Sequence, residues 1–485
     1  MSFISYCYPG SDKGVASVLE ELFYPRSVAF VGFTSAPSDW SSRMMPRALI
    51  DFGFEGRVYL VSRSGEQLPG LQTFTSFTQV PEPVDLVVCN IPARATPGLL
   101  EECVAKGVPF VHLVTSGFSE IGYEEGRQLE RQIVEIARRG GIRLLGPNCP
   151  GFYCPASHFS FSSLLPRESG TVGWFAQSGG HCIRFLRMAG ARGVRFSKAV
   201  AMGNAADLDA AAFMEYFSQD EATKVICCYV EGVRDGQRFL SLARKASLVK
   251  PVIIHKGGHT SAGTRATASH TGALAGNDIV WEALCQQAKV LRLYSIEEMV
   301  NTVLPFALLP PPKGRKVAVL GYGGGLSVQA ADDCERAGLE VPPFPSELRE
   351  RLASFTPVPN NSVKNPVDTQ HLVFSRAEWM ETVRLATGWE GVDLAIFPVA
   401  IDMMPLLEEE DILETMVENI IAAKEVCSKP AVVVLHQGVS ASMSAVVTAA
   451  ASKLCAAGFP VFPTLAEAAR ALARCLSYYE ASRES

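Results

Sequence analysis

One sequence pattern, present three times, constrains the fold of this chain. In each copy a short apolar segment runs directly into glycine and small polar residues, and a stretch of helical periodicity follows. The three apolar segments are 27–32, 170–175 and 316–321. A buried parallel strand that leads through a glycine turn into a helix is the building unit of doubly wound α/β domains. Three copies therefore predict three α/β domains, each with a parallel sheet.

Length and composition agree with this prediction. The chain has 485 residues, of which 48% are hydrophobic and 19% are charged, as expected for buried sheets covered by helices at about 150 residues per domain. We expect domains at 15–151, 152–304 and 313–485. Pro305 is expected to end the helix before it, and the run 310–312 (Pro-Pro-Pro) to form a stiff connector.

Further segments follow the same α/β rhythm. Strands are predicted at 84–91, 108–115 and 142–145 in the first domain, at 196–202, 225–230 and 252–255 in the second, and at 394–399 and 431–436 in the third. Helices are predicted between them at 97–106, 124–139, 210–217, 237–248, 408–425 and 441–457.

Charge and cysteine usage exclude several classes of protein. A net charge of −6 provides no basic stripe for nucleic acid. No run approaches the ~18 apolar residues of a membrane span, and the start of the chain lacks the pattern of a secretory signal. The 13 cysteines show no C-x-x-C spacing, which argues against a disulfide framework and against a metal site. We expect a cytoplasmic protein with reduced, buried thiols and no membrane contact.

The first glycine turn does not match a dinucleotide fingerprint. Of the three glycines in G-x-G-x-x-G only Gly32 is present. The hydroxyls of Thr34 and Ser35 are suited to a phosphate group, so a nucleotide-like ligand is expected in place of a nicotinamide cofactor. A purely structural turn is the alternative.

His270 stands in a run of small and flexible residues, 268–276 (Ala-Ser-His-Thr-Gly-Ala-Leu-Ala-Gly). Neither helix nor strand is favoured there, and the imidazole is the only bulky polar group. This composition is typical of a mobile catalytic histidine. Taken alone, the run is better explained as an ordinary polar loop, and the catalytic interpretation depends on what surrounds it.

Several segments together resemble a known family, the nucleoside-diphosphate-forming acyl-CoA synthetases, which include succinyl-CoA ligase and ADP-forming acetate-CoA ligase. The similar segments are 146–151 (Gly-Pro-Asn-Cys-Pro-Gly), 171–173 with 177–179, 229–236 (Tyr-Val-Glu-Gly-Val-Arg-Asp-Gly), 269–276 and 365–368 (Asn-Pro-Val-Asp). They occur in a consistent order, whereas the remaining C-terminal part is similar in rhythm only.

The resemblance implies a Rossmann-like domain that binds coenzyme A, followed by two flavodoxin-like ligase domains. In such enzymes acyl-CoA and inorganic phosphate give an acyl phosphate, which phosphorylates a histidine that passes the phosphoryl group to a nucleoside diphosphate. Carried onto this chain, that histidine is His270 and its carboxylate partner is Glu231. A carboxylate that accepts the proton of one ring nitrogen leaves the other neutral and able to attack. The alternative for Glu231 is a solvated loop carboxylate.

The remaining site residues are expected at the carboxyl ends of strands, where open parallel sheets bind ligands. For coenzyme A we predict Gly32, Thr34, Ser35, Ser116, Gly117, Phe118 and Asn148. For phosphate we predict two helix starts with N–H groups facing the anion, formed by Ser178, Gly179 and Gly180 and by Gly323, Gly324 and Gly325. The alternative is that these glycines only permit close packing of helix and sheet.

Two departures from the family pattern stand near these residues. His181 follows the second glycine pair, where we expect it to cap the helix rather than contact phosphate. Ala205 and Ala206 replace a position that is often charged in the family, which indicates a different substrate preference.

The family's nucleotide-binding ATP-grasp module is missing from the expected domains, which use up the length of the chain. The resemblance therefore implies an α-type subunit that acts on a small carboxylic acid or its acyl-CoA. ADP or ATP with Mg²⁺ would be bound by an ATP-grasp partner chain, in a heterotetramer. Two alternatives are a regulatory protein that binds coenzyme A and a coenzyme A transferase that uses no nucleotide.

Overall fold

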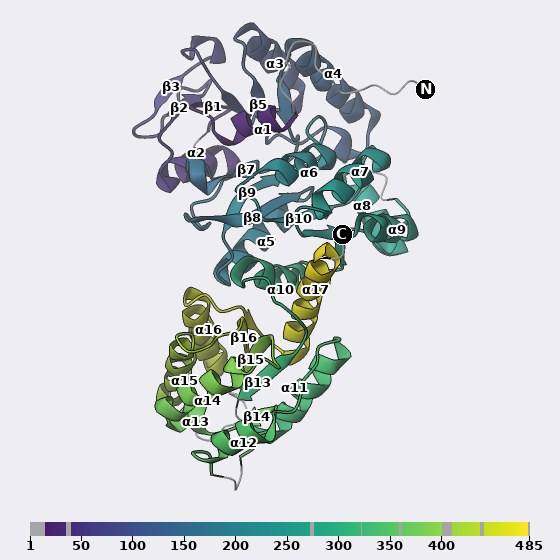
Figure 1. Ribbon diagram of the computed structural model, residues 1–485. Coiled ribbons are helices and arrows are strands. Elements are labelled where there is room, and N and C mark those ends of the chain that lie inside the picture. Colours follow the sequence, from purple (N-terminus) through teal and green to yellow (C-terminus); the bar gives the residue numbers. More distant parts are fainter. Residues whose placement is uncertain are drawn as a thin grey trace. The chain divides into compact units, whose positions relative to one another are not determined.

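The computed structural model describes residues 15–34, 40–271, 276–321, 323–357, 361–399, 410–436 and 441–483. These residues contain three sheets of mainly parallel strands with interleaved helices (Figure 1). The predicted fold class is thereby confirmed. Contacts divide the chain into two compact units. Unit 1 comprises residues 1–187 and 195–296, and unit 2 comprises residues 188–194 and 297–485. The three domain limits given above stay a prediction.

The first sheet, in unit 1, has the strand order β3-β2-β1-β4-β5-β6, with all strand pairs parallel. Its strands are β1 (Ser27–Val31), β2 (Arg57–Val61), β3 (Gln72–Phe74), β4 (Leu86–Cys89), β5 (Phe110–Leu113) and β6 (Arg143–Leu145). Its helices are α1 (Val15–Phe23), α2 (Trp40–Phe52), α3 (Thr96–Ala105) and α4 (Glu124–Gly140), with short turns η1 (Phe77–Gln79), η2 (Ala93–Ala95) and η3 (Ser119–Ile121). The chain order reverses between β1 and β4, and such a switch point is where an open parallel sheet forms a ligand crevice.

The second sheet, also in unit 1, has the order β12-β11-β10-β8-β9-β7. Its strands are β7 (Phe152–Tyr153), β8 (Ser169–Ala176), β9 (Phe196–Ala201), β10 (Val225–Val230), β11 (Val252–Lys256) and β12 (Leu291–Leu293), and a turn η4 (Pro155–Ser157) follows β7. Strand β7 pairs antiparallel with β9 and is the exception in a parallel sheet. Its helices are α5 (Gly179–Ala191), α6 (Ala210–Gln219), α7 (Gly236–Ser247), α8 (Ser261–Thr271) and α9 (Asp278–Ala288).

The helices of the second sheet begin where polar side chains cap them. Asp209 accepts a hydrogen bond from the backbone N–H of Ala212, and Asp235 accepts one from Arg238. Asn277 does the same for α9. Such N-caps satisfy backbone donors that the first turn of a helix leaves unpaired. The carboxyl ends of β9 and β10 therefore lead into well-defined helix starts.

The third sheet, in unit 2, has the order β14-β13-β15-β16-β17. Its strands are β13 (Val317–Gly321), β14 (Val367–Asp368), β15 (Leu394–Val399), β16 (Ala431–Leu435) and β17 (Val461–Phe462). Its helices are α10 (Ile296–Leu308), α11 (Gly324–Arg336), α12 (Ser346–Ala353), α13 (His371–Phe374), α14 (Arg376–Gly388), α15 (Glu410–Ala423), α16 (Ala441–Ala456) and α17 (Leu465–Arg483). Trp379 and Phe397 pack edge to face at the centre of its core.

The prediction that Pro305 ends a helix was wrong, because α10 continues through it to Leu308. Proline removes one backbone donor from a helix interior, but Leu304 and Phe306 on either side are buried and hold the helix in place. Polar contacts also anchor α10 to α17, since Asn301 Nδ2 donates to Glu467 Oε1 at 3.1 Å and Arg474 donates to Thr302 Oγ1 at 3.2 Å.

No described helix combines the length and the apolar character that a bilayer crossing requires. The described cysteines are free thiols, and all but Cys427 are buried.

Candidate functional site

Two strand ends approach closely at the switch point of the first sheet, and a glycine makes this approach possible. Gly32 follows β1, adopts φ 96° and donates its N–H to the carbonyl of Val61 at 3.0 Å. A Cβ at this position would lie 2.3 Å from the carbonyl oxygen of Asn90, which follows β4. The chain therefore needs glycine here for the close approach of two strand ends as well as for the left-handed conformation.

The predicted hydroxyls of this turn are only partly described. Thr34 is half-buried, and its Oγ1 lies 3.4 Å from both carboxylate oxygens of Glu66. Ser35 lies outside the described residues.

In the loop after β5, the carboxylate of Glu120 accepts hydrogen bonds from backbone N–H groups of the same loop. Glu120 Oε1 accepts from the N–H of Gly117 at 2.5 Å, and both carboxylate oxygens accept from the N–H of Phe118 at 3.2 Å. The ring of Phe118 has no exposed surface, so it packs in the core. Ser116 is the exposed side chain of the loop. Two residues predicted for coenzyme A, Gly117 and Phe118, thus have their N–H groups bonded to Glu120.

Asn148 lies beside the same loop. Its N–H donates to the carbonyl of Thr115 at 3.0 Å, and its backbone adopts the left-handed conformation with φ 61°, which asparagine tolerates better than most residues. The structure thus brings Ser116, Gly117 and Asn148 together at one edge of the sheet.

Asn204 connects the two sheets of unit 1. Its Nδ2 donates to Glu120 Oε2 at 2.6 Å and to Glu130 Oε2 at 2.9 Å. The turn that carries it packs tightly, because its N–H donates to the carbonyl of Pro147 and a Cβ at Gly203 would lie 2.1 Å from that same oxygen. The loop after β5 is therefore fixed to the turn after β9.

The N-terminus of α5 is capped by an uncharged group. Ser178 Oγ accepts from the N–H of His181 at 3.3 Å, and the imidazole Nδ1 lies 3.1 Å from the same hydroxyl. The His181 ring stacks on Tyr229, with ring centroids 4.4 Å apart. The cap is therefore Ser178 and not His181, whose ring contacts the capping hydroxyl. Gly179 and Gly180 form the first turn, where the N–H groups of a helix have no partner inside it.

Glu231 is buried directly after β10, and the neighbouring strand end holds its backbone. Its side chain is 4% exposed. Gln177 Oε1 accepts from the N–H of Glu231 and, at 3.0 Å, from that of Gly232. The hydroxyl of Tyr229 donates to Glu231 Oε1 at 3.3 Å. Burial raises the pKa of Tyr229 and the charge of Glu231 adds to the rise, so the phenol stays a donor to the carboxylate.

A cavity of about 420 Å³ opens at these strand ends. Its walls come from the loop after β5, from α4, and from the turns after β8, β9 and β10. The lining residues are Ser119, Arg127, Glu130, Arg131, Gln177, Asn204, Ala205, Asp209, Ala210, Ala211, Gly232, Val233, Arg234 and Asp235. We call this space the unit 1 cavity.

His270 lies on the helix next to this cavity. Helix α8 extends to Thr271, so the prediction that neither helix nor strand forms was wrong for 268–271. Alanine and the hydroxyl residues continue a helix that Thr260 starts, since Thr260 Oγ1 accepts from the N–H of Gly263 at 3.1 Å. Helix α8 contacts η3, whose Ser119 lines the unit 1 cavity. The His270 side chain and residues 272–275 lie outside the described part.

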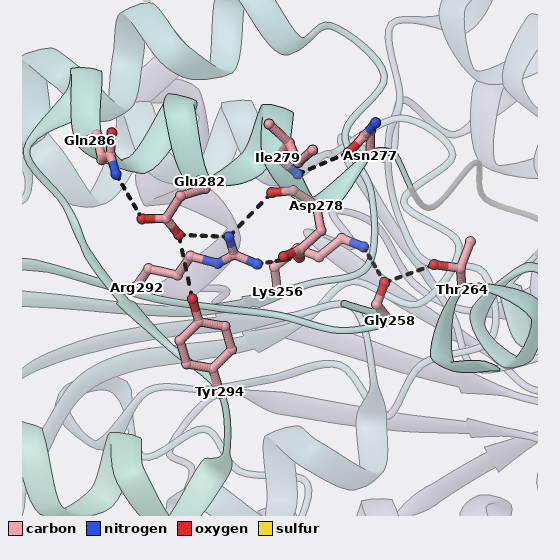
Figure 2. A network of polar contacts seen from close by, with 10 residues as sticks. All are labelled: Lys256, Gly258, Thr264, Asn277, Asp278, Ile279, Glu282, Gln286, Arg292 and Tyr294. Carbon is pink, nitrogen blue, oxygen red and sulfur yellow. Dashed lines mark hydrogen bonds and ion pairs between the residues drawn. The ribbon is translucent and has the colours of Figure 1, made fainter. Parts of the chain in front are cut away.

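A polar network holds the segments on both sides of these residues (Figure 2). Lys256 Nζ donates to the carbonyl of Gly258 at 2.7 Å, and this carbonyl also accepts from Thr264 Oγ1 of α8 at 3.0 Å. On the other side, Arg292 of β12 forms ion pairs with Asp278 and, at 2.8 Å, with Glu282 of α9. The starts of α8 and α9 are therefore both tied to the sheet.

The two cations that the sequence places near His270 differ in their surroundings. Lys256 is 1% exposed, and burial lowers its pKa while the charge of Asp278 opposes the shift. Arg265 lies on the exposed side of α8. Lys256 thus supports the turn before α8.

Known families and proteins are similar to this chain over most of its length. Residues 26–155 match the family model for a CoA binding domain, and residues 169–306 match that for a succinyl-CoA ligase like flavodoxin domain. The α subunit of ADP-forming acetate–CoA ligase I from Pyrococcus furiosus is 39% identical over 358 residues, which cover 72% of this chain and 76% of the relative. The chain belongs to the NDP-forming acyl-CoA synthetase family.

Two further matches extend the similarity. The α subunit of acetate–CoA ligase II from the same organism is 34% identical over 83% of this chain and 87% of its own length. Among solved structures, the dinucleotide forming acetyl-coenzyme A synthetase 1 of Ca. Korarchaeum cryptofilum, in complex with phosphate and ADP, superposes with a TM-score of 0.81 at 30% identity. That match covers 96% of this chain and 97% of the other. The C-terminal part, which resembles the family only in its alternation of strands and helices, thus shares the fold of this solved structure.

The third glycine turn of the chain lies in unit 2, and a carboxylate from another segment, that of Asp368, binds its backbone. Gly323 has φ 114°, and its N–H donates to Asp368 Oδ1 at 2.7 Å, just before α11 begins at Gly324. Asn365 fixes the segment, because its Oδ1 accepts from Val319 N at 3.0 Å and its Nδ2 donates to the carbonyl of Val317 at 2.8 Å. Phosphate binding at 323–325 stays a prediction.

Sequence reasoning missed the polar residues that connect separate segments. Gln177 stood within a recognised motif without a role of its own, and Glu120 and Asn204 received none. No local rule singles out Glu120, because the side chains that commonly bind nearby backbone N–H groups are those of Asp, Asn, Ser and Thr. Asn204 and Glu130 are 74 residues apart, and no local pattern predicts that pair.

Proposed function

We propose that this chain is the α-type subunit of an NDP-forming acyl-CoA synthetase. It interconverts acyl-CoA, ADP and phosphate with a carboxylic acid, coenzyme A and ATP, through an acyl phosphate and a phosphohistidine at His270. The observation that carries this proposal is the buried Glu231, held by Gln177 at the unit 1 cavity. Helix α8, which carries His270, contacts a wall of the same cavity.

Glu231 serves as the group that orients the histidine. A buried carboxylate that accepts the proton of one imidazole nitrogen fixes the tautomer and leaves the other nitrogen free for the phosphoryl group. Phosphate binds next to it at the N-terminus of α5, where Ser178, Gly179 and Gly180 supply uncharged donors. Gly323, Gly324 and Gly325 are assigned as a second helix start for phosphate in unit 2, where the N–H of Gly323 must first be released by Asp368.

Coenzyme A occupies the crevice of the first sheet. The family model for CoA binding spans this sheet, and the crevice lies at its topological switch point. The residues assigned to the cofactor are Gly32, Thr34, Ser35, Ser116, Gly117, Phe118 and Asn148. Because the ring of Phe118 is buried and its N–H is bonded to Glu120, its assignment to the cofactor requires that Glu120 release this N–H.

A partner chain completes the enzyme. Two relatives from Pyrococcus furiosus are named α subunits. The match to acetate–CoA ligase I of Archaeoglobus fulgidus covers 78% of this chain but only 54% of that relative. We assign ADP or ATP with Mg²⁺ to an ATP-grasp chain of the β type and the assembly to a heterotetramer in the cytoplasm.

Turnover with a candidate partner tests this function. The chain is mixed with an ATP-grasp chain, acyl-CoA, phosphate and ADP, and both ATP and free thiol are measured. Both products form with the wild-type chain and with the control His158→Ala, an exposed histidine, and neither forms with His270→Ala. Acyl transfer between carboxylic acids without nucleotide would establish a coenzyme A transferase instead, and binding of coenzyme A without any turnover would establish a regulatory protein.

A further inference from the structure

The orientation of the Gln177 carboxamide is fixed by two backbone donors. Its Oε1 accepts from the N–H of Glu231 and from the N–H of Gly232. Only the oxygen of a carboxamide accepts hydrogen bonds, so these two contacts determine which end is oxygen and which is nitrogen. The Nε2 amino group therefore lies on the other side of the amide carbon, away from the Glu231 turn.

This amino group belongs to a side chain that is almost enclosed and lines the unit 1 cavity. Gln177 is 7% exposed. Among the described residues, no acceptor binds its Nε2. Nε2 is not among the enclosed side-chain atoms without a partner, so it is open to the cavity. The cavity thus contains an amide donor that is available to an oxygen atom of a ligand.

The acidic residues of the cavity wall are engaged elsewhere. Asp209 and Asp235 accept from the first-turn N–H groups of α6 and α7. Glu130 accepts from Ser119 Oγ at 2.6 Å and from Asn204 Nδ2 at 2.9 Å. The wall also carries three guanidinium groups, and these too are bonded within the protein: Arg127 and Arg131 pair with Glu124, and Arg234 donates to the carbonyl of Ala206 at 2.6 Å. With charged groups of both signs engaged, the neutral donor Nε2 is the group that the wall offers to an acceptor oxygen.

We propose that Gln177 donates a hydrogen bond from Nε2 to an oxygen of the phosphate or phosphoryl group in the unit 1 cavity. The inference rests on the proposed function, which supplies that anion, and deepens it by one residue. Gln177 then makes two kinds of contact: its Oε1 accepts from the backbone of Glu231 and Gly232, and its Nε2 donates to the anion. Binding of phosphate and positioning of Glu231 are thereby coupled through one rigid amide.

The variant Gln177→Glu separates the two functions of the amide. Glutamate retains an oxygen that accepts from both N–H groups but replaces the donor with a negatively charged oxygen. We expect the dissociation constant for inorganic phosphate, measured by titration calorimetry at pH 8 with saturating coenzyme A, to rise at least about 10-fold, since 1.4 kcal/mol corresponds to a factor of ten. The affinity for coenzyme A is expected to stay unchanged.

The pH dependence distinguishes a ligand contact from a structural role. An ordinary glutamic acid side chain titrates near 4.3, and its protonated form is again a donor. The ratio of variant to wild-type dissociation constants is therefore expected to stay near its pH 8 value down to about pH 5 and to fall as the pH is lowered further toward about 4. A residue that only supports the fold gives a ratio that does not change with pH.

A matched control is available on the first sheet. Gln79 Oε1 also accepts from a backbone N–H, that of Thr75 at 3.2 Å, and the side chain is exposed. Gln79→Glu introduces the same charge and is expected to bind phosphate as the wild type does. Should Gln177→Glu fail to fold, Gln177→Met removes the donor without adding charge and is expected to weaken phosphate binding as well.

Two results would overturn the inference: phosphate affinity of Gln177→Glu equal to that of the wild type at pH 8, or no phosphate binding by the wild type. Because the titration uses neither nucleotide nor partner chain, its outcome is independent of turnover. A wild-type chain that binds phosphate through Gln177 but never forms phosphohistidine contradicts the proposed function and leaves this inference in place.

Discussion

The starts of α5 and α11 share one local design but are closed by different groups. Each follows a buried parallel strand and begins at glycine. The α5 start is capped by the hydroxyl of Ser178, whereas the N–H just before α11 is bonded to the carboxylate of Asp368. A hydroxyl leaves the positive end of the helix uncompensated, and a carboxylate neutralises part of it. The α5 start is therefore the better place for a phosphate dianion in this conformation.

The same contrast extends to the surroundings. In unit 1 the neutral amides of Gln177 and Asn204 organise the strand ends, and Glu231 is buried next to them. In unit 2 Asn365 and Asp368 hold the strand end and the helix start together. A single strand–glycine–helix pattern thus produces one helix start capped by a hydroxyl and one closed by a carboxylate.

The largest effect is expected from Glu231→Gln. This change keeps the size of the side chain but removes the charge that orients the imidazole, so formation of phosphohistidine is expected to slow by about 10²-fold. Quench-flow labelling with the partner chain measures the rate. The control Glu215→Gln removes a carboxylate that pairs with Arg238 at 3.3 Å on α6 and α7, and its rate should match the wild type. Equal rates in the two variants would show that Glu231 does not orient the histidine.

Acidification is expected to destabilise unit 1 through His112. Burial lowers the pKa of His112 to about 4 although its Nε2 lies 3.0 Å from the carbonyl of Cys149. Because the unfolded chain binds a proton near pH 6.5, the stability from the neutral ring is full above that pH and is lost as the pH falls toward 4. Between pH 7 and 4.5 the loss is about 2 kcal/mol.

Hydrogen exchange in β5 and β15 compares the two units in this pH range. In His112→Gln the exchange of β5 amides should depend less steeply on pH, while that of β15 stays as in the wild type. Burial also lowers the pKa of His371 in unit 2, opposed by the charge of Glu378, and this term is untouched by the substitution. An unchanged pH slope in β5 would show that His112 is not the titrating group.

The smallest effect is expected from Asp368→Ala, which removes the acceptor of the Gly323 N–H. Loss of this hydrogen bond costs about 1 kcal/mol, so amides at the start of α11 are expected to exchange about fivefold faster. Asp332→Ala is the control, because Asp332 forms an exposed pair with Arg336 on the same helix at 3.7 Å. No difference between the variants would mean that Asp368 does not close this helix start.

The sequence predicted the sheets well because their strands are uniformly buried. Strands β10 and β15 have the predicted limits of 225–230 and 394–399, and each of their residues is buried. The errors lie where tertiary packing overrides local preference. Pro305 continues a helix because its neighbours are buried, and the run around His270 is partly helical because Thr260 and the Gly258 carbonyl begin a helix upstream.

The candidate site was predictable only in part for a related reason. Glu231, Asn148 and Ser178 stand in motifs that local sequence identifies, and the structure places each at a strand end. The contacts that decide the electrostatics join distant segments, as Gln177 with Glu231 over 54 positions and Gly323 with Asp368 over 45. Such pairs follow from the strand order, which a single sequence does not specify.

The most direct test of the central claim is the identity of the residue that carries the phosphoryl group. The chain is incubated with ³²P-labelled ATP and an ATP-grasp partner, and the labelled peptide is identified by mass spectrometry. We expect a base-stable, acid-labile label on His270, absent in His270→Ala and retained in His158→Ala. An acid-stable label, or a label on any other residue, would contradict the claim.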